Sequence, residues 1–308
     1  MLLKSKALTK IQDIITQLTG HEYICSEIVE KQYNLEVIVH YNKQKIKVLV
    51  YFGKKGVSTI VQGDNNSDFY IKVKQIAIGE ELFNTVRNIP DEPDEYIGID
   101  ESGKGDLFGP LVIAAVLVDE NIKTKLSQIG VKDSKLLSDS QIKSISRRIR
   151  SIITINRYNV IVINPEKYNQ LYNSFKNLNK LLAWGHSKAI ENLVQQHDVS
   201  TAISDKFGNE GLIISELSKK KINLNLIQQT KAERYTAVAA ASILAREKVL
   251  DWIERMSAEL KISIPLGAGS VTNVTMNKIA NEKGKEILAK LVKLHFKNYV
   301  KYSNTVKG

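Results

Sequence analysis

Cysteine and proline are scarce in this chain, and long hydrophobic runs are missing. Cys25 is the one cysteine among 308 residues, so no disulfide can form within the chain, and a reducing compartment is the simplest setting. The longest apolar run, Leu111 to Val118, is far shorter than the about 20 residues that a membrane helix requires. The first residues show no apolar segment typical of a signal peptide. We therefore expect a soluble, cytoplasmic protein without a membrane partner.

Several catalytic signatures are missing as well. The five histidines form no pair at a metal-ligand spacing, and a single cysteine cannot complete a zinc site. No Gly-x-Ser-x-Gly segment is present, which argues against a serine hydrolase. The glycines near residue 103 lack the spacing of a Walker A loop, which argues against a P-loop nucleotide site. We expect no organic cofactor, and we expect a monomer.

Positive charge is in excess, with 44 Lys and Arg against 33 Asp and Glu, a formal net charge of +11. This excess favours a polyanionic partner such as nucleic acid, although a basic protein can also simply have a well-solvated surface. The hydrophobic fraction of 43% is ordinary for a globular protein, and a chain of 308 residues favours two domains.

The first part of the chain predicts a small α+β domain over residues 1–88. Apolar residues at helical spacing are followed by apolar residues that alternate as they do in strands. The first helix carries Leu8, Ile11, Ile15 and Leu18, the strands cover 33–41, 46–52 and 57–61, and a closing helix carries Leu82, Val86 and Ile89. The helices would cover one face of the sheet.

Lysines gather on the opposite face of the second strand, because side chains alternate across a strand. They are Lys43, Lys45 and Lys47, with Lys54 and Lys55 just beyond. These lysines could bind a nucleic-acid backbone, or they could form an ordinary solvated face.

An acidic segment with two prolines predicts a linker at 89–95. Strands and helices alternate beyond it, over 96–308, which is typical of a mixed sheet with helices on both faces. The expected strands cover 96–100, 111–118, 152–163 with an interruption near Asn156, 199–204 and 222–227. The expected helices begin at Ser138, where the sequence has the form of a capping box, near Leu178 and near Ala237.

The most informative segment is residues 99–105, at the end of the first strand of the second domain. Side chains on a strand alternate between faces, so we expect the strand to end between Asp100 and Glu101, which would let both acids reach one site. Gly103 and Gly105 would let backbone N–H groups approach a phosphate closely, and Lys104 adds positive charge.

Two further acids occupy comparable positions. Asp205 ends a later strand, and Glu233 precedes an alanine-rich helix. Strand ends of one α/β sheet converge, so Asp100, Glu101, Asp205 and Glu233 could share a pocket. Two like charges about 4 Å apart repel by roughly 4 kcal/mol at an effective dielectric of 20, so such a cluster needs divalent cations. Carboxylate oxygens suit Mg²⁺ or Mn²⁺, and two such ions would hydrolyse a phosphodiester. The alternative is that each acid is an ordinary turn or helix-start residue.

These motifs resemble a known family, the type 2 ribonucleases H, and within it the bacterial ribonuclease HIII group. The resemblance covers about residues 93–300. It is carried, in the family's order, by Asp100 to Asp106, Lys132-Asp133-Ser134-Lys135, Asn177 to His186, Ser204 to Gly208 and Ala239 to Ala245. The N-terminal domain is similar to the TATA-binding-protein-like domain that this group carries ahead of its catalytic domain.

The resemblance implies a ribonuclease H-like α/β domain that cuts the RNA strand of RNA/DNA hybrids and leaves 3′-hydroxyl and 5′-phosphate ends. Asp100, Glu101, Asp205 and Glu233 would be the catalytic residues and would hold two ions, Mg²⁺ or Mn²⁺. The ribonuclease HII group usually has Asp at the last position, so Glu233 favours the HIII group. The substrate-binding residues would be Gly103, Lys104, Gly105, Ser134 and Lys135, together with Lys43, Lys45 and Lys47.

Two alternatives remain open. An enzyme of the ribonuclease HII kind would cut at a single ribonucleotide embedded in duplex DNA. A non-catalytic hybrid-binding protein would use these acids only for structure and would not hydrolyse a hybrid in Mg²⁺.

Overall fold

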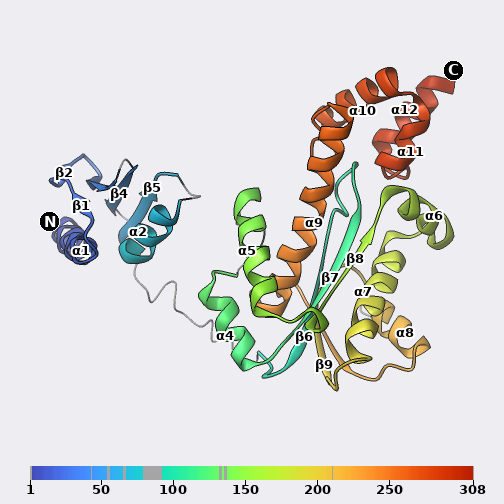
Figure 1. The fold of residues 1–308 in the computed structure, drawn as a ribbon, viewed down its shortest axis with the longest axis horizontal. Coiled ribbons are helices and arrows are strands. Elements are labelled where there is room, and N and C mark those ends of the chain that lie inside the picture. The colour runs from blue at the N-terminus through green and yellow to red at the C-terminus, as the bar shows by residue number, and fades with distance from the viewer. Residues whose placement is uncertain are drawn as a thin grey trace. The chain divides into compact units, whose positions relative to one another are not determined.

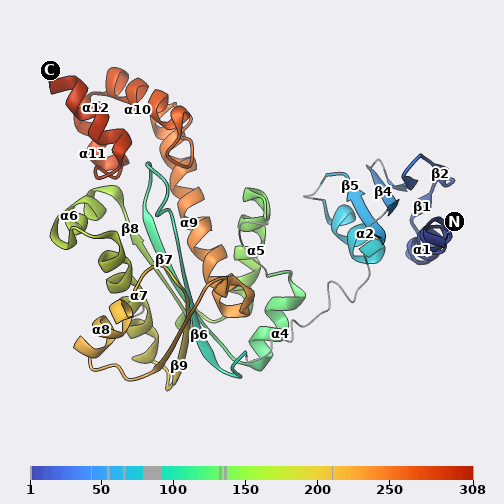
Figure 2. The same cartoon turned by 180° about the vertical axis from the view of Figure 1, so that it is seen from behind.

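The computed structural model describes residues 2–42, 44–53, 56–64, 67–78, 92–131, 134, 137–209 and 211–307. The chain divides into two compact units, Met1–Val86 and Arg87–Gly308, each of which is described by itself (Figures 1 and 2). Residues 89–91 of the linker predicted at 89–95 lie outside the described ranges, as do residues 79–88 before them. The helix expected from Leu82, Val86 and Ile89 falls in the same stretch.

The N-terminal unit is an antiparallel sheet with two helices packed on one face. The strand order is β1-β3-β4-β5, with β2 paired to β3. The elements are α1 (Leu2–Gly20), β1 (Ile24–Cys25), β2 (Val29–Glu30), β3 (Asn34–Tyr41), β4 (Gln44–Gly53), β5 (Gly56–Gln62) and α2 (Asp68–Ile78). Ile11 and Leu18 of α1 share an apolar core with alternate strand residues such as Val37 and Val48. The α+β prediction is confirmed, and α2 is a helix that the sequence analysis did not predict.

The opposite face of this sheet is mixed rather than purely basic. Lys45 and Lys47 lie on it, and Lys47 Nζ is 2.9 Å from Glu36 Oε1. Leu49 and Ile60, which pair across β4 and β5, lie on the same face. The other predicted lysines, Lys43, Lys54 and Lys55, lie outside the described residues. The described part of this face therefore combines positive charge with apolar side chains.

The C-terminal unit is built on a mixed five-stranded sheet of order β10-β9-β6-β7-β8. The strands are β6 (Tyr96–Ser102), β7 (Leu111–Val118), β8 (Tyr158–Ile163), β9 (Thr201–Asp205) and β10 (Asn225–Gln229). Strands β6, β9 and β10 run parallel, while β7 is antiparallel to both of its neighbours. Every residue of β7 is buried, as expected for a continuous apolar strand covered on both faces.

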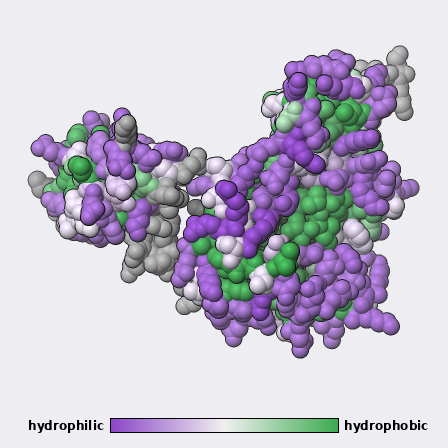
Figure 3. Space-filling model, in the orientation of Figure 1, coloured by the Kyte–Doolittle hydropathy of each residue, from purple (hydrophilic) through white to green (hydrophobic). Residues whose placement is uncertain are grey.

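Helices cover both faces of this sheet (Figure 1). They are α4 (Glu120–Gln128), α5 (Asp139–Ile152), α6 (Pro165–Phe175), α7 (Leu178–Val194), α8 (Gly211–Lys219), α9 (Thr236–Leu260), α10 (Ser270–Lys283), α11 (Leu288–Leu291) and α12 (Lys297–Lys307). One apolar core joins the sheet to α4, α5 and α9, and another joins it to α6, α7 and α8. The predicted mixed sheet with flanking helices is confirmed. Apolar residues show at the surface between α9 and α7, while the outer sides of the helices are mostly hydrophilic (Figure 3).

Of the five strands predicted for the C-terminal unit, only 111–118 has the bounds of the structure. The strand expected at 199–204 is formed by Thr201–Asp205, and the one expected at 222–227 by Asn225–Gln229. The strand expected at 152–163 is formed only by Tyr158–Ile163, because Ile152 ends α5. The interruption expected near Asn156 is the 3₁₀ turn Ile155–Arg157. Strand β6 does not end between Asp100 and Glu101; it continues to Ser102, with Glu101 paired to Ile113 of β7. The capping box at Ser138 is present, with reciprocal hydrogen bonds between Ser138 and Gln141.

A largely buried ion pair joins α5 to α9 and provides a test of how these two helices pack. Arg150 donates from Nη1 to Glu247 Oε1 at 2.9 Å and from Nη2 to Oε2 at 2.8 Å. Burial opposes ionisation of Glu247, but the hydrogen bonds and charge of Arg150 lower its pKa. The stabilisation is therefore present above the pKa that Glu247 has in the unfolded chain. It is lost as the pH falls through the lower pKa that Glu247 has in the folded protein.

We expect Arg150→Met to reduce the free energy of unfolding by about 3 kcal/mol, because it removes both hydrogen bonds of Arg150 from the buried Glu247 carboxylate, which then keeps only Lys248, at 3.4 Å, among the described residues. Removing both charges, in Arg150→Met/Glu247→Leu, should restore most of that loss. Urea unfolding at neutral pH measures both variants. A single variant as stable as the wild type would show that the pair does not support the packing.

Candidate active site

Three of the four predicted acids line one pocket in the C-terminal unit, with a volume of about 350 Å³. They are Asp100, Glu101 and Asp205. The other lining residues are the loop Ser102 to Gly105 and the side chains of Ser134, Leu137, Asp139, Ser242 and Arg246. The pocket therefore combines acids from β6 and β9 with a glycine-lysine-glycine loop.

The sheet itself explains why two neighbouring strand residues reach the same pocket. Pairing between β6 and β9 stops at Ile99 and Ser204, so the edge of β6 is open beyond that point. Asp100 and Glu101 still point to opposite faces of β6, but both flank this open edge. Asp205, the last residue of β9, stands across the opening. The two acids therefore reach one pocket because β6 and β9 separate, and not because β6 ends between Asp100 and Glu101.

Asp100 is anchored on the side of the sheet that α9 covers. Its Oδ1 accepts a hydrogen bond from the Glu101 backbone N–H at 2.8 Å, and it also hydrogen-bonds Ser242 of α9. The Ser242 hydroxyl is 2.7 Å from the Ser134 hydroxyl. Burial, followed by the charge of Glu101, raises the pKa of Asp100, and the hydrogen bond from Ser242 only partly offsets this rise. Ser134 thus acts on Asp100 through Ser242.

Glu101 is anchored on the opposite side of the sheet. Its side chain is only 4% exposed, and Oε1 is 2.6 Å from Lys104 Nζ. Its Oε2 is 3.0 Å from Nε2 of His186, a fully buried residue of α7. Burial favours the neutral acid, but His186 and Lys104 outweigh burial and lower the pKa of Glu101. The two adjacent carboxyls are therefore pushed in opposite directions, because each has different neighbours.

Glycine is found at positions 103 and 105 of the loop for different physical reasons. Gly103 has φ +87°, and a Cβ there would lie 2.2 Å from the Pro110 carbonyl oxygen, so no other residue fits without a shift of the backbone. A Cβ added at Gly105 would meet nothing within 4 Å, so there is open space beside the backbone of this residue. Lys104, between them, has a side chain that is 46% exposed. The loop presents a cation and an accessible backbone to the pocket.

The remaining predicted residues stand differently. Asp205 Oδ1 accepts a hydrogen bond from the Ala232 N–H at 3.2 Å, and Glu233 is the next residue, in a 3₁₀ turn, although it is not among the residues that line the pocket. Lys135 lies outside the described residues. The described part of the chain holds no group of three or more His, Cys, Asp or Glu side chains already arranged to hold a metal ion. The acids share a pocket without forming a finished ion cage.

The donor set nevertheless fits a hard divalent cation. All three carboxylates offer oxygen ligands. Burial first, and then the charges of Glu101 and Asp205, raise the pKa of Asp100, and a bound cation would oppose that rise. Sequence reasoning did not assign His186, Asp139, Ser242 or Arg246 to the site. His186 and Ser242 lie within segments that carry the family resemblance, so the sequence could have drawn attention to them. Their contacts with Glu101 and Asp100 could be found only in the structure.

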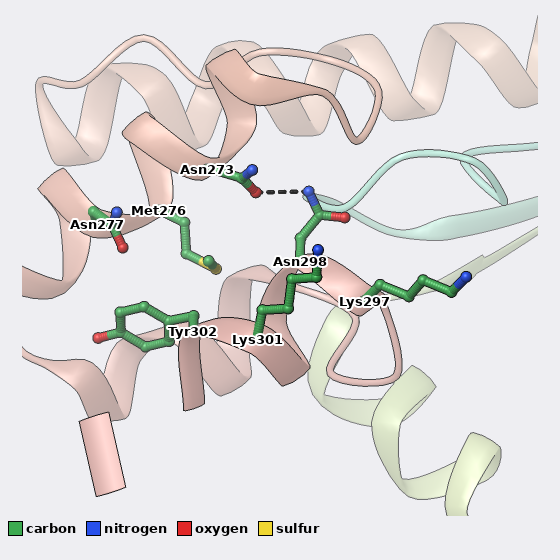
Figure 4. Close-up of a pocket in the computed structure, with 7 residues that line it drawn as sticks. All are labelled: Asn273, Met276, Asn277, Lys297, Asn298, Lys301 and Tyr302. Carbon is green, nitrogen blue, oxygen red and sulfur yellow. Dashed lines mark hydrogen bonds between the residues drawn. The ribbon is translucent and has the colours of Figure 1, made fainter. Parts of the chain in front are cut away.

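A second pocket of about 370 Å³ lies between α10 and α12 (Figure 4). Asn273, Met276 and Asn277 come from α10, and Lys297, Asn298, Lys301 and Tyr302 come from α12. Asn298 Nδ2 donates to Asn273 Oδ1 at 2.6 Å, which joins the two helices across the pocket (Figure 4). The sequence analysis predicted neither helix.

A family model described as ribonuclease HII matches residues 97–299, nearly the whole C-terminal unit. Together with a mixed sheet that gathers acids at the opening between β6 and β9, this match defines a metal-dependent ribonuclease H. Ribonuclease HIII of Protochlamydia amoebophila (strain UWE25) is 46% identical over 202 residues, 66% of each chain. Ribonuclease HIII of Chlamydia pneumoniae is 41% identical over 246 residues, 78% of this chain and 80% of that protein. The chain belongs to the ribonuclease HIII family.

Solved structures agree with this assignment. Bst-RNase HIII in complex with Mn²⁺ matches with a TM-score of 0.63 and 26% identity, over 96% of this chain and 97% of that one. RNase HII from Archaeoglobus fulgidus, solved in complex with PCNA, matches with a TM-score of 0.54 and 30% identity. This match covers 95% of the archaeal chain but only 66% of this chain. No helix among the described residues is long and apolar enough to cross a membrane.

Proposed function

We propose that this enzyme hydrolyses the RNA strand of RNA/DNA hybrids at internal positions, using two divalent cations, Mg²⁺ or Mn²⁺. The observation that carries the proposal is the pocket in which Asp100, Glu101 and Asp205 meet beside the Gly103 to Gly105 loop. The Mn²⁺ complex of Bst-RNase HIII supports a metal site in this fold. The proposal requires one copy of the chain and no organic cofactor.

The acids and the glycine-lysine-glycine loop would have different roles in the reaction. Asp100, Glu101 and Asp205 would hold the cations, and Glu233 would join them from the turn that follows Ala232. Bound cations would activate a water and stabilise negative charge on the leaving oxygen. Gly103 and Gly105 would let the backbone approach the scissile phosphate, and Lys104 would offset its charge. Water adds to phosphorus, the bond from phosphorus to the 3′ oxygen breaks, and the products carry 3′-hydroxyl and 5′-phosphate ends.

One cleavage experiment tests the proposal and its alternatives. The substrates are a labelled RNA/DNA hybrid, a DNA duplex with one ribonucleotide, and an all-DNA duplex, each in EDTA, Mg²⁺ or Mn²⁺. We expect cleavage of the hybrid only with a metal, and little cleavage of the other two. Efficient cleavage at the single ribonucleotide would favour an activity of the HII kind, and intact hybrid in every buffer would favour a non-catalytic binding protein.

The N-terminal unit favours the HIII kind of activity over the HII kind. The Mn²⁺-bound HIII structure covers both units of this chain, whereas the archaeal HII structure leaves about a third of it unmatched. We propose that the N-terminal sheet binds the hybrid through Lys45 and Lys47, with Lys43 nearby in the sequence. Phosphate contacts of this kind are independent of sequence and weaken with salt.

We expect Lys45→Ala/Lys47→Ala in the full chain to raise KM for the hybrid about tenfold at moderate salt, with kcat nearly unchanged. The slope of log affinity against log salt should fall by about one per lysine removed. Lys6→Ala/Lys10→Ala, on α1, is the matched control because that helix packs on the other face of the sheet. Equal KM values in the two double variants would remove the lysine face from the proposal.

A further inference from the structure

His186 is a buried histidine that contacts Glu101 from outside the lining of the active-site pocket. It has no exposed surface, and its Nε2 is 3.0 Å from Glu101 Oε2. Its Nδ1 is 3.1 Å from the hydroxyl of Ser204, the residue before Asp205. One ring on α7 thus connects the open edge of β6 with the end of β9.

The hydrogen-bond directions follow from the chemistry of the partners. An ionised carboxylate only accepts hydrogen bonds, so Nε2 carries a hydrogen and donates it to Glu101. Nδ1 is 3.1 Å from the Ser204 hydroxyl, whose single hydrogen has two acceptors within reach, Nδ1 and the Asp205 carbonyl oxygen at 3.0 Å. The ring therefore has a polar partner on each side, as in the carboxylate networks that surround metal ligands.

This arrangement gives the two oxygens of Glu101 different tasks. Oε2 is held by a side chain that cannot leave the core, while Oε1 contacts Lys104, which is 46% exposed at the pocket. We propose that His186 is a positioning residue that holds Oε2 of Glu101 and so orients the carboxylate for metal binding. The inference rests on the proposed function, because it assumes that Glu101 is a metal ligand.

The test compares variants of His186 by Mn²⁺ binding, followed by electron paramagnetic resonance without substrate, and by kinetics on the hybrid. His186→Leu removes the donor at similar size and should weaken Mn²⁺ binding about 10- to 100-fold, with kcat reduced and KM for the hybrid unchanged. His186→Gln can still donate to Glu101 and should recover most of the affinity. Ser204→Ala should have a smaller effect of the same kind.

A folded Leu variant that binds Mn²⁺ as the wild type does would overturn the role of His186. If the Leu variant does not fold, the comparison of His186→Gln with the shorter His186→Asn decides, and equal Mn²⁺ affinities in these two overturn it. A wild type that binds no Mn²⁺ or cuts no hybrid would instead overturn the proposed function. The two failures are therefore distinguishable.

The pocket between α10 and α12 supports a second inference on separate observations. None of the described residues that line it is acidic, and the lining combines two lysines with three carboxamides and a phenol. In Figure 4 Lys301 reaches from α12 towards the asparagine pair that joins the helices, while Lys297 extends to the other side. A concave site made of cationic and neutral donors fits the oxygens of a phosphate.

This pocket is connected to the catalytic loop by short contacts. Asn298 Nδ2 donates to the Ala268 carbonyl at 3.1 Å, and the neighbouring Gly267 N–H donates to Asp106 Oδ1 at 2.6 Å. Asp106 directly follows Gly105. Phe108 also pairs with Val292, the residue that directly follows α11. We infer that the pocket binds the phosphodiester backbone of the hybrid away from the cleaved bond, which rests on the proposed substrate.

The test measures binding of a fluorescent hybrid in EDTA, where it stays intact, across a range of salt. Lys297→Ala/Lys301→Ala should weaken binding and lower the slope of log affinity against log salt by about two. Lys283→Ala/Lys290→Ala removes the same charge from the same group of helices, outside the pocket, and should leave the slope nearly unchanged. Equal slopes in both variants would overturn the pocket, whereas a wild type that binds no hybrid would overturn the proposed substrate.

Discussion

Asp100→Asn should lower kcat at least about a thousandfold, which corresponds to about 4 kcal/mol of transition-state stabilisation. The substitution keeps the size of the side chain and its contact with Ser242, but removes the charge that would hold a cation. Affinity for the hybrid in EDTA should change little, because binding depends on phosphate contacts elsewhere. Single-turnover cleavage and fluorescence binding measure the two quantities.

Asp139→Asn is the matched control for this prediction. Asp139 lines the same pocket, but it stands at the start of α5, 3.8 Å from Arg246, and we do not assign it to the metal. Its replacement should reduce kcat far less than that of Asp100. Wild-type turnover in Asp100→Asn would remove this residue from the catalytic set, and equal losses in both variants would point to a general effect of charge.

The same substitution should also affect stability, with a sign that the raised pKa of Asp100 determines. The folded state retains the proton to a higher pH than the unfolded state, so ionisation of Asp100 lowers stability as pH rises through that interval. At neutral pH without metal, Asp100→Asn should therefore be at least as stable as the wild type. Mn²⁺ should raise the melting temperature of the wild type and leave that of the variant nearly unchanged.

Gly98→Ala should be among the most destabilising single substitutions in the C-terminal unit. A Cβ at Gly98 would lie 2.3 Å from the Ala237 carbonyl carbon and 2.3 Å from the Val238 nitrogen, both in the backbone of α9. Backbone atoms cannot rotate away, so the helix would have to separate from β6. We expect a loss of about 3 kcal/mol and a fall of roughly 6–12 °C in the melting temperature of this unit.

The separation should also impair the active site, because Gly98 is two residues before Asp100 and α9 carries its partner Ser242. Gly269→Ala is the control, since a Cβ there meets nothing within 4 Å. Its melting temperature should remain within about 1 °C of the wild type. A Gly98→Ala variant as stable as this control would show that α9 and β6 are less closely packed than described.

Much of the site was predictable from local sequence. The apolar run before Asp100, the adjacent acid and the glycine-lysine-glycine turn are contiguous, so their chemistry can be recognised without a fold. Asp205 was predictable because it ends a mostly buried strand. The roles of Glu233 and Lys135 stay predictions: Glu233 lies beside the pocket rather than in its lining, and Lys135 lies outside the described residues.

The sequence by itself indicated the class of chemistry, because two adjacent acids directly before a glycine-lysine-glycine segment are contiguous in the chain and match the opening motif of the family. The tertiary structure alone decided how neighbouring residues on one strand reach the same pocket: β9 parts from β6 after Ile99. It also decided which side chains hold the acids, Ser242 from α9 and His186 from α7. These partners are distant in sequence and approach only when helices pack on opposite faces of the sheet, so no local pattern could assign them.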